Sequence, residues 1–400
     1  MKSFKEYLLK DCLEFIIDHR GKTPTKMGGT WVEKGVRVIS ALNVHNGSID
    51  NVDQIRCVTE EVYKRWMSED VKRNDCFIAS EGASLGENCI WDSDEKIVLG
   101  QRLYALRTNP EILDPWYFAC YMQTNKFRTQ IDQISTGSTV FGISQPVLLS
   151  VKLVLPEINQ QRVIGELYKN LKRKIENNNQ CNAELEAVAR TIYDYWFLQF
   201  DFPDENGRPY KSSGGKMVWN EELKREIPEG WEDGIFADFF EIGNGRDHKH
   251  LLDGAIPVYG SGGIMRYVDE ALYNGESVLI PRKGTLNNIF YIKDAFWTVD
   301  TMYFTKMKKE NVAIFMYYTV KQYDFEKMNT GTGVPSMTAS IIYNLKTVIP
   351  KWDILRQFDN KVQSIYDMIK QNEKQNKELV SLRDFLLPLL MNGQVGFKEC

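Results

Sequence analysis

Residues 167–196 read LYKNLKRKIENNNQCNAELEAVARTIYDYW, and this stretch decides the fold that we expect. Its apolar residues recur at steps of three and four, which places them in one narrow stripe along a helix. Such a stripe is typical of a coiled-coil seam and not of the broader face that a globular helix buries. The stripe consists of Leu167, Leu171, Ile175, Asn178, Asn182, Leu185, Ala189, Ile192 and Trp196. The helix that we expect starts earlier, at Pro156, and its roughly forty residues at ~1.5 Å each predict a length of ~60 Å.

The stretch occurs a second time, as KVQSIYDMIKQNEKQNKELVSLRDFLLPLL at residues 361–390. The residues before the two copies also correspond at a constant offset: Thr136-Gly137 with Thr330-Gly331, Lys152 with Lys346, and Pro156 with Pro350. The second stripe is Lys361 (or Val362), Ile365, Ile369, Asn372, Asn376, Leu379, Arg383 (or Leu382), Leu386 and Leu390. We expect Pro388 to end or kink the second helix near its last turn.

Asparagines interrupt both stripes at matching positions. Asn178 and Asn182 correspond to Asn372 and Asn376. An asparagine in a seam costs stability and fixes register. Asparagine is common in this chain, so a chance placement is the alternative, but two matched pairs in two matched helices favour the specific interpretation. We therefore expect an antiparallel coiled coil of the chain with itself, related by a pseudo-twofold axis near the asparagines.

The repeat divides the chain into globular segments and helices. We expect a first domain at 1–155, a long helix at 156–200, a linker at 201–230, a second domain at 231–350, and a second long helix at 351–392 that pairs with the first. Strand-like alternation, glycine-marked turns and short helical stretches mix in both domains. The predicted class is α+β, with two mixed domains separated by two long helices.

Short patterns predict the elements of each domain. In the first, residues 7–16 and 115–123 favour helices, while 36–40, 75–80, 97–99 and 103–106 favour strands. In the second, 235–242 matches the opening helix and 277–284 matches the strand and turn at 76–82. Residues 296–300 match 97–101, which are the strand at 97–99 and the polar position Gln101 after it. The first domain is the longer of the two, whereas the helices match in length. A fixed spacer with variable heads suggests a reader of two different half-sites.

Residues 201–230 have the composition of a linker, rich in proline, glycine and charge. Phe202, Tyr210, Met217 and Trp219 are nevertheless too apolar for a free tether. We expect this segment to pack against another part of the chain.

Composition excludes several classes of protein. A chain of 400 residues suggests two or three domains. No signal peptide and no apolar run long enough for a membrane span are present, so we expect no membrane partner. Seven cysteines without a C-x-x-C pair predict reduced thiols and a cytoplasmic protein. The net charge of −4 argues against a free-standing nucleic-acid binder, although a local basic groove or a partner could supply the phosphate contacts.

No catalytic or metal-binding set emerges from the residues. His248 and His250 could share a face, but no third ligand has a familiar spacing, so we expect solvated loop histidines. The glycines at 243–245 and 259–263 match neither the dinucleotide nor the Walker A pattern, so we interpret them as turns. An amino-methyltransferase tetrad and a nuclease motif are also missing. We expect a chain that binds and does not catalyse.

Some loops suit nucleic acid. Arg282-Lys283-Gly284-Thr285 offers two cations beside a glycine, and Gln101-Arg102, Asn43 and His45 carry donors for base edges. Each alone could be an ordinary solvated loop, but their recurrence in both domains favours binding. The full candidate set for DNA contact is Asn43, His45, Ser80, Gln101, Arg102, Thr136, Gly137, Ser138, Thr139, Tyr259, Ser261, Gly262, Arg282, Lys283, Gly284, Thr285, Thr330, Gly331 and Thr332.

Several short motifs, in this order and with the internal repeat, resemble one family. They are Leu155-Pro156 with Gln160-Gln161-Arg162, the linker GRPYKSSGG at 207–215, IPEGW at 227–231, IPVYGSGGI at 256–264 and FWTVDT at 296–301. The chain resembles, over essentially its whole length, the specificity subunit of type I restriction–modification systems. It departs from the family at 351–356, where the second copy does not keep the clear Gln-Arg motif of the first copy.

The resemblance implies the following roles. Each domain would be a target recognition domain that reads one half of a split, asymmetric double-stranded DNA site, and the coiled coil would set the spacer. Two methyltransferase subunits would dock on the chain and supply S-adenosylmethionine binding and adenine-N6 methylation. Two restriction subunits would supply ATP- and Mg-dependent translocation and cleavage. The chain itself would hold no cofactor, yet both methylation and restriction would need it.

Two other classes remain open at this point. A fused methyltransferase or nuclease would bind S-adenosylmethionine or metal by itself, and the missing tetrad speaks against it. A coiled-coil scaffold with ligand-binding heads and no DNA role would not copurify with a methyltransferase.

Overall fold

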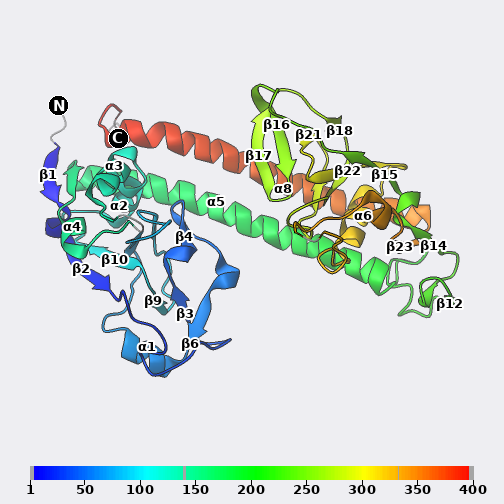
Figure 1. Ribbon diagram of the computed structural model, residues 1–400, viewed down its shortest axis with the longest axis horizontal. Helices are drawn as coiled ribbons and strands as arrows, with labels where there is room; N and C mark the ends of the chain where they lie inside the picture. Colours follow the sequence, from blue (N-terminus) through cyan, green and yellow to red (C-terminus); the bar gives the residue numbers. More distant parts are fainter. Residues whose placement is uncertain (1–3, 138–140, 332, 396–400) are drawn as a thin grey trace. The chain divides into compact units, whose positions relative to one another are not determined.

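A computed structural model of the chain describes residues 4–137, 141–331 and 333–395 (Figure 1). The chain forms two compact units, one made of Met1–Asn178 with Lys374–Cys400 and the other of Asn179–Glu373. Two long helices, α5 (Ile158–Tyr193) and α8 (Trp352–Met391), each contribute to both units. We call residues 5–155 head 1 and residues 231–350 head 2. Each unit thus holds one head and one part of each long helix.

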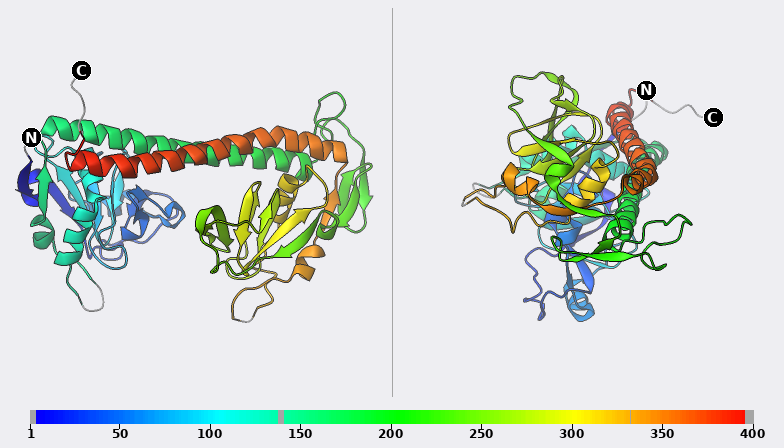
Figure 2. Two further views of the ribbon diagram at one scale, coloured as in Figure 1. Left: turned by 90° about the horizontal axis from the view of Figure 1, so that it is seen from above. Right: turned by 90° about the vertical axis from the view of Figure 1, so that its right-hand side faces the viewer.

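Within each unit α5 and α8 lie side by side and run antiparallel (Figure 2). In the first unit, Ile164 of α5 shares a core with Leu390 of α8, while Asn178 reaches back to Asn376. In the second, Asn182 of α5 pairs with Asn372, and the ring of Tyr193 contacts that of Phe358 at 6.3 Å. Residue numbers that rise along α5 therefore meet numbers that fall along α8, which confirms the antiparallel pairing.

The ends of both helices follow from local chemistry. Helix α5 gives way to a π-helical turn at Asp194–Leu198, and Phe200 then takes a left-handed conformation with φ of 64°. Helix α8 continues to Met391, about one turn beyond Pro388, and the Asn392 N–H bonds to the Pro388 carbonyl at 3.0 Å. The proline thus lies in the last turn, as expected.

Head 1 contains a four-stranded sheet and a three-stranded sheet. The first has the order β2 (Leu13–Asp18), β10 (Leu103–Thr108), β7 (Cys76–Ala79), β8 (Asn88–Ile90). The second has the order β6 (Arg56–Val58), β3 (Val36–Ile39), β9 (Ile97–Leu99), with β3 and β9 parallel. Two further pairs are β1 (Lys5–Leu8) with β11 (Lys152–Leu155), and β4 (Val44–His45) with β5 (Ser48–Ile49). The helices are α1 (Glu60–Trp66), α2 (Pro115–Met122), α3 (Asn125–Ile134) and α4 (Gln145–Leu149).

Head 2 repeats this plan. Its first four-stranded sheet has the order β15 (Phe240–Asn244), β22 (Met302–Met307), β19 (Ser277–Pro281), β20 (Phe290–Ile292). Its second has the order β17 (Gly263–Val268), β16 (Asp253–Gly260), β21 (Ala295–Thr298), β18 (Tyr273–Asn274), with β16 and β21 parallel. The closing pair is β14 (Glu232–Ile235) with β23 (Lys346–Ile349), and the helices are α6 (Ala313–Val320) and α7 (Ala339–Tyr343).

The two heads share the strand order of the first sheet, the closing pair and the parallel pair, so the internal repeat extends into the folded structure. The second sheet of head 2 has a fourth strand, β18, that the described part of the second sheet of head 1 lacks. Head 1 is longer because it adds α1, α3 and the β4–β5 hairpin, for which the described part of head 2 shows no equivalent. The predicted α+β class and the repeat are confirmed.

The helices predicted at residues 7–16 and 235–242 are wrong. Each is a strand, a 3₁₀ turn and a second strand: β1, Leu9–Cys12 and β2 in head 1, and β14, Phe236–Asp238 and β15 in head 2. The apolar spacing there suits a helix, but both strands find partners far along the chain, and such pairing overrides local preference. The error repeats because the motif repeats.

Residues 201–230 pack against head 2, as their aromatic content indicates. The Phe202 ring stacks on Tyr210 at 4.7 Å and on Trp231 at 5.1 Å, and Trp231 is buried. A hairpin of β12 (Met217–Asn220) and β13 (Arg225–Pro228) follows. Trp219 is the exception, with 57% of its surface exposed.

The first turns of α5 meet head 1 through a buried glutamine. Gln161 accepts a hydrogen bond from the Asp114 N–H at 3.1 Å and donates to the carbonyls of Ile112 (3.0 Å) and Pro156 (2.9 Å). The repeat places Leu355 at this position in α8, where it is buried in an apolar core. The residue that caps the head helix changes likewise, from Asp114 before α2 to Val312 before α6. The departure from the family at 351–356 thus replaces a polar contact with an apolar one.

Candidate DNA-recognition loops

In head 1, four backbone hydrogen bonds join three loops at one edge of the four-stranded sheet. We call these residues, 80–82, 100–102, 136–137 and 141–143, loop cluster 1. The bonds run from Ser80 N to Arg102 O (2.8 Å), from Ile143 N to Ser80 O (2.8 Å), from Gly82 N to Phe141 O (3.0 Å) and from Thr136 N to Gly142 O (3.0 Å). These bonds hold together three segments that are far apart in the sequence.

Head 2 has the same four bonds. Its loop cluster 2 comprises residues 282–284, 299–301, 330–331 and 335–337. The bonds run from Arg282 N to Thr301 O (2.8 Å), from Met337 N to Arg282 O (2.9 Å), from Gly284 N to Pro335 O (3.0 Å) and from Thr330 N to Ser336 O (3.0 Å). Gly284 suits its position because its φ is +89° and an added Cβ would lie 2.6 Å from Ser261 Oγ.

A tyrosine hydroxyl donates a hydrogen bond to a backbone carbonyl of each cluster. Tyr104 donates its hydroxyl to the Ile143 carbonyl at 3.0 Å, and Tyr303 donates to the Met337 carbonyl at 3.4 Å. An arginine guanidinium lies over each ring, from Arg20 in head 1 (4.3 Å) and from Arg282 in head 2 (5.7 Å). The two arginines occupy different places in the repeat, so the contact is retained although its sequence position is not.

The side chains on this shared frame differ between the heads. Glu81 of head 1 corresponds to Lys283 of head 2, since both form a bridge with the following loop. In head 1, Arg102 Nε lies 3.1 Å from Glu81 Oε1, and both side chains are exposed. The equivalent pair in head 2 is Thr301 and Lys283, which leaves a cation without that acidic partner. The same backbone therefore presents different charges.

Four cations in or beside cluster 2 form no ion pair with a described acidic side chain. Within the part of the chain that the structure describes, none of these residues lies within 4.0 Å of a carboxylate oxygen: Arg246, Lys249, Arg282 and Lys283. Around cluster 1, Arg20 pairs with Asp18 at 2.9 Å, whereas Lys22 forms no ion pair with a described residue and donates to the Trp66 carbonyl at 2.6 Å. Unpaired cations on loops are suited to phosphate contacts.

The other candidates of head 1 lie in cluster 1 or close to it, and they differ in burial and in hydrogen bonding. Asn43 is buried, and its side chain accepts from Ser40 N at 3.0 Å and faces the carbonyls of Asp50 and Asn51. Its amide is thus engaged within its own loop. His45 Nε2 lies 3.1 Å from the Leu42 carbonyl. Ser80 is 1% exposed, and its hydroxyl has no partner among the described residues. Gln101 is exposed and donates to the Lys22 carbonyl at 3.3 Å.

The other candidates of head 2 divide in the same way. Tyr259 is buried against Phe290, and burial raises its pKa to about 12, so it stays neutral. Gly262 and Thr285 are exposed, and Ser261 is half-buried. Thr330 donates its hydroxyl to the Ser336 carbonyl at 3.1 Å, and the Gly331 N–H bonds to Asn329 at 2.8 Å. In head 1, Gly137 has a φ of 143°. Ser138, Thr139 and Thr332 lie outside the described residues.

Sequence reasoning missed a pocket beside cluster 2. It has a volume of about 660 Å³ and its lining includes His248, Met265, Asp300 and Thr301 together with Ser261 and Gly262. His248 was expected to be solvated, but its Nδ1 atom is buried and has no hydrogen-bond partner in the described part of the chain. Strand β21 ends at Thr298, so Asp300 is exposed on a turn, in the position that Gln101 has in head 1.

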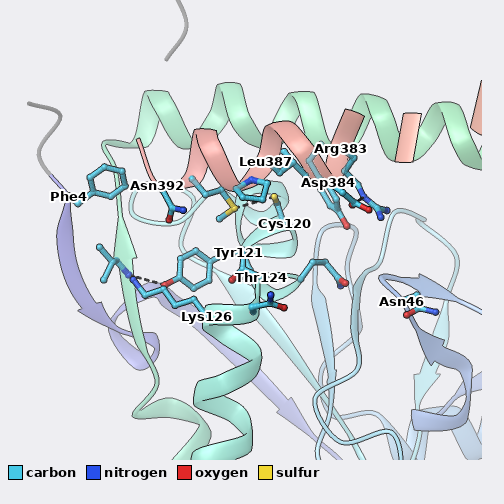
Figure 3. A pocket seen from close by; sticks show the side chains of 16 residues that line it. Phe4, Asn46, Cys120, Tyr121, Thr124, Lys126, Arg383, Asp384, Leu387 and Asn392 are labelled. Atoms are coloured by element: carbon cyan, nitrogen blue, oxygen red, sulfur yellow. Dashed lines mark hydrogen bonds and ion pairs between the residues drawn. The ribbon is translucent and has the colours of Figure 1, made fainter. Parts of the chain in front are cut away.

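A larger pocket of about 940 Å³ lies in the first unit, between the α2–α3 junction and the last turns of α8 (Figure 3). Cys120, Tyr121 and Leu387 form its apolar part, and Lys126 and Arg383 add two cations. The hydroxyl of Tyr121 accepts from the Val154 N–H at 3.3 Å. None of the sequence-predicted DNA residues lines it, so it is separate from the loop clusters.

Asparagines form polar contacts between the long helices in each unit. In the first, Asn178 is buried and donates to Gln375 Oε1 at 2.9 Å and to Asn376 Oδ1 at 2.8 Å. In the second, Asn372 donates to Asn182 Oδ1 at 2.8 Å. Buried amides that pair in this way are satisfied, which limits their cost.

A buried histidine makes the stability of head 1 depend on pH. His19 is 4% exposed, with Nδ1 3.2 Å from Met67 Sδ, and burial lowers its pKa from 6.5 to about 4. The unfolded chain takes up the proton near pH 6.5, whereas the folded chain does so only near pH 4. Stability is therefore lost as pH falls through this window. We expect a loss of about 2 kcal/mol between pH 7.5 and pH 5.

Chemical denaturation at both pH values measures this loss. His19→Gln should remove most of the pH dependence, and His45→Gln, on a loop of the same head, should retain it. An unchanged dependence in His19→Gln contradicts the assignment.

Comparison with known proteins places the chain in a family. The family model for the type I restriction modification DNA specificity domain matches residues 1–187 and 228–379, so the chain belongs to this family. The type I restriction enzyme MjaIX specificity subunit of Methanocaldococcus jannaschii is 26% identical over 71% of this chain and 69% of its own length. The HindI specificity subunit of Haemophilus influenzae is 20% identical over 81% and 87%.

The fold agrees with a solved structure. The type I restriction–modification S subunit from M. genitalium matches with a TM-score of 0.62 and 16% identity, over 100% of this chain and 97% of that one. As a member of the family, the chain is a non-catalytic, DNA-recognising specificity subunit. Among the described residues, no helix is both long and apolar enough to cross a membrane.

Proposed function

We propose that the chain reads a bipartite DNA site, with loop cluster 1 on one half and loop cluster 2 on the other. The observation that carries this proposal is the shared frame: four equivalent backbone hydrogen bonds hold different side chains in the two heads. A common frame with Glu81 and Arg102 in one copy and Lys283 and Thr301 in the other suits two related but different targets. Reading two different half-sites requires both a common backbone frame and side chains that differ between the heads.

The chemistry around cluster 2 supports DNA as the ligand. Lys283 and the neighbouring unpaired cations suit phosphates, and such contacts position a protein without specifying sequence. Exposed polar side chains on the same loops suit base edges. Of the sequence candidates, we give Asn43 and Tyr259 supporting roles, because the first is bonded within its loop and the second is buried. We retain the exposed ones for direct contact.

The long helices supply the other half of the proposal. We propose that the α5–α8 pair sets the unread spacer between the half-sites and that the asparagine contacts fix its register. Two methyltransferase subunits would dock on the repeated structure and bring S-adenosylmethionine, and two restriction subunits would bring ATP and Mg. A chain of net charge −4 needs such partners to share the DNA. The cytoplasm is the compartment that we propose.

The test is to coexpress the chain with the methyltransferase of the same system and to map N6-methyladenine in host DNA. We expect a split motif of two fixed blocks around an unread gap, absent when the methyltransferase is expressed alone. A stable complex that leaves the DNA unmethylated contradicts the proposal. Failure to form any complex favours a coiled-coil scaffold without a DNA role.

A further inference from the structure

The turn between β21 and β22 has an equivalent in head 1. The Val299 N–H bonds to the Tyr259 carbonyl at 3.0 Å, as the Gly100 N–H bonds to the Ile39 carbonyl at 2.7 Å. These bonds align the two turns without reference to sequence similarity. Asp300-Thr301 therefore stands where head 1 has Gln101-Arg102.

The backbone of this turn is fixed while a side chain remains available. The Thr301 carbonyl accepts from the N–H groups of Arg282 (2.8 Å) and Lys283 (3.2 Å), which ties the turn to the rest of cluster 2. The Asp300 side chain is exposed and forms no ion pair with any described residue. A rigid backbone with a free carboxylate is well suited to recognition.

His248 lines the pocket beside the turn, and one of its ring nitrogens has no partner among the described residues. His248 Nδ1 is buried, and Asp247, His248 and Lys249 face the turns at 260–262 and 299–301 across about 660 Å³. A buried polar atom that stays unpaired costs free energy.

We infer that Asp300 is a specificity-determining residue of head 2, with His248 beside it in the same pocket, and that Gln101-Arg102 has the same role in head 1. The inference rests on the proposed function and adds the chemistry of the contact. An aspartate accepts a hydrogen bond from the exocyclic amino group of cytosine or adenine in the major groove. Gln101 suits adenine and Arg102 suits guanine.

The pairing of Arg102 with Glu81 does not prevent a base contact. Both side chains are exposed, at 56% and 43%, and exposed ion pairs contribute little to stability. A guanine edge can replace the carboxylate as the partner of the guanidinium. Head 1 and head 2 would then read chemically opposite groups from the same turn.

The experiment uses the coexpressed complex of full-length chain and methyltransferase, with the methylated motif as readout. Asp300→Asn keeps the shape of the side chain but adds a donor, and the exchange Asp300→Gln with Thr301→Arg installs the head 1 turn. We expect the preference for one base pair in one half-site to change by about fivefold to about a hundredfold. The other half-site and the spacer should remain as they are. His248→Gln should relax preference in the same half-site.

Glu270→Gln is the matched control, since it removes a carboxylate beyond the far end of β17 from the pocket. It should leave the motif unchanged. A split motif in the wild type that stays the same in the Asp300 variants overturns this inference and leaves the proposed function intact. A wild type without a split motif overturns the proposed function itself. If the exchange variant does not assemble, Asp300→Asn alone decides.

Discussion

Arg107→Met is expected to destabilise the first unit by about 3 kcal/mol. Arg107 on β10 donates to both carboxylate oxygens of Asp75, at 2.9 and 2.8 Å, and to Glu69 at 2.7 Å. The Asp75 side chain is 1% exposed and that of Arg107 16%. Removing one partner of a buried pair leaves the other charge unpaired, which costs about 3–5 kcal/mol. We expect the lower end, because Arg107 keeps some contact with water.

Chemical denaturation of the chain, followed in the transition of the first unit, measures this effect. The double variant Arg107→Met with Asp75→Asn should recover much of the lost stability, since it also removes the unpaired negative charge of Asp75. Arg73→Met is the surface control: Arg73 pairs with Asp92 and Asp94 but is 40% exposed, so its loss should cost at most about 1 kcal/mol. An effect of that size in Arg107→Met contradicts the role given to the pair.

The long helices and the repeat could be predicted because their signals are local or periodic. The seam of α5 can be recognised from the spacing of its apolar residues, and the second copy in α8 supports the same prediction independently. The strands around Val98 and Phe77 were also predictable, since they are short, apolar and bounded by turn residues. The two opening strands, β1 and β2, were not predictable, because Leu9 and Cys12 between them follow a helical spacing while the strands pair with β11 and β10 far along the chain.

The candidate loops could be predicted because they recur in both domains, but the hydrogen bonds of their side chains could not. The glycine at 284 and the cations before it could be recognised as a loop suited to phosphate. That the Asn43 amide is used within its own loop depends on residues up to eight positions away, Asp50 and Asn51. Asp300 was not among the candidate residues, although the match of 296–300 with 97–101 places it opposite Gln101. Its place on a turn is decided by the hydrogen bond between Val299 and Tyr259.

The second large effect is expected from exchanging a whole head. Residues 231–350 begin and end on neighbouring strands, because Glu232 of β14 pairs with Ile349 of β23. A foreign head can therefore enter through two adjacent junctions. Its helix-facing residues must be compatible, because Phe315 of head 2 packs on Phe197 at 4.7 Å in the wild type. Keeping Trp231 preserves the stack with Phe202.

The exchange tests most directly the claim that each head reads one half of the site. Residues 231–350 are replaced by the equivalent head of a specificity subunit whose target is known, and the N6-methyladenine motif is mapped after coexpression with the methyltransferase. The account predicts a hybrid motif, with one half replaced by that of the donor and the other half and the spacer unchanged. A motif in which both halves change, or in which the original site persists whole, contradicts it.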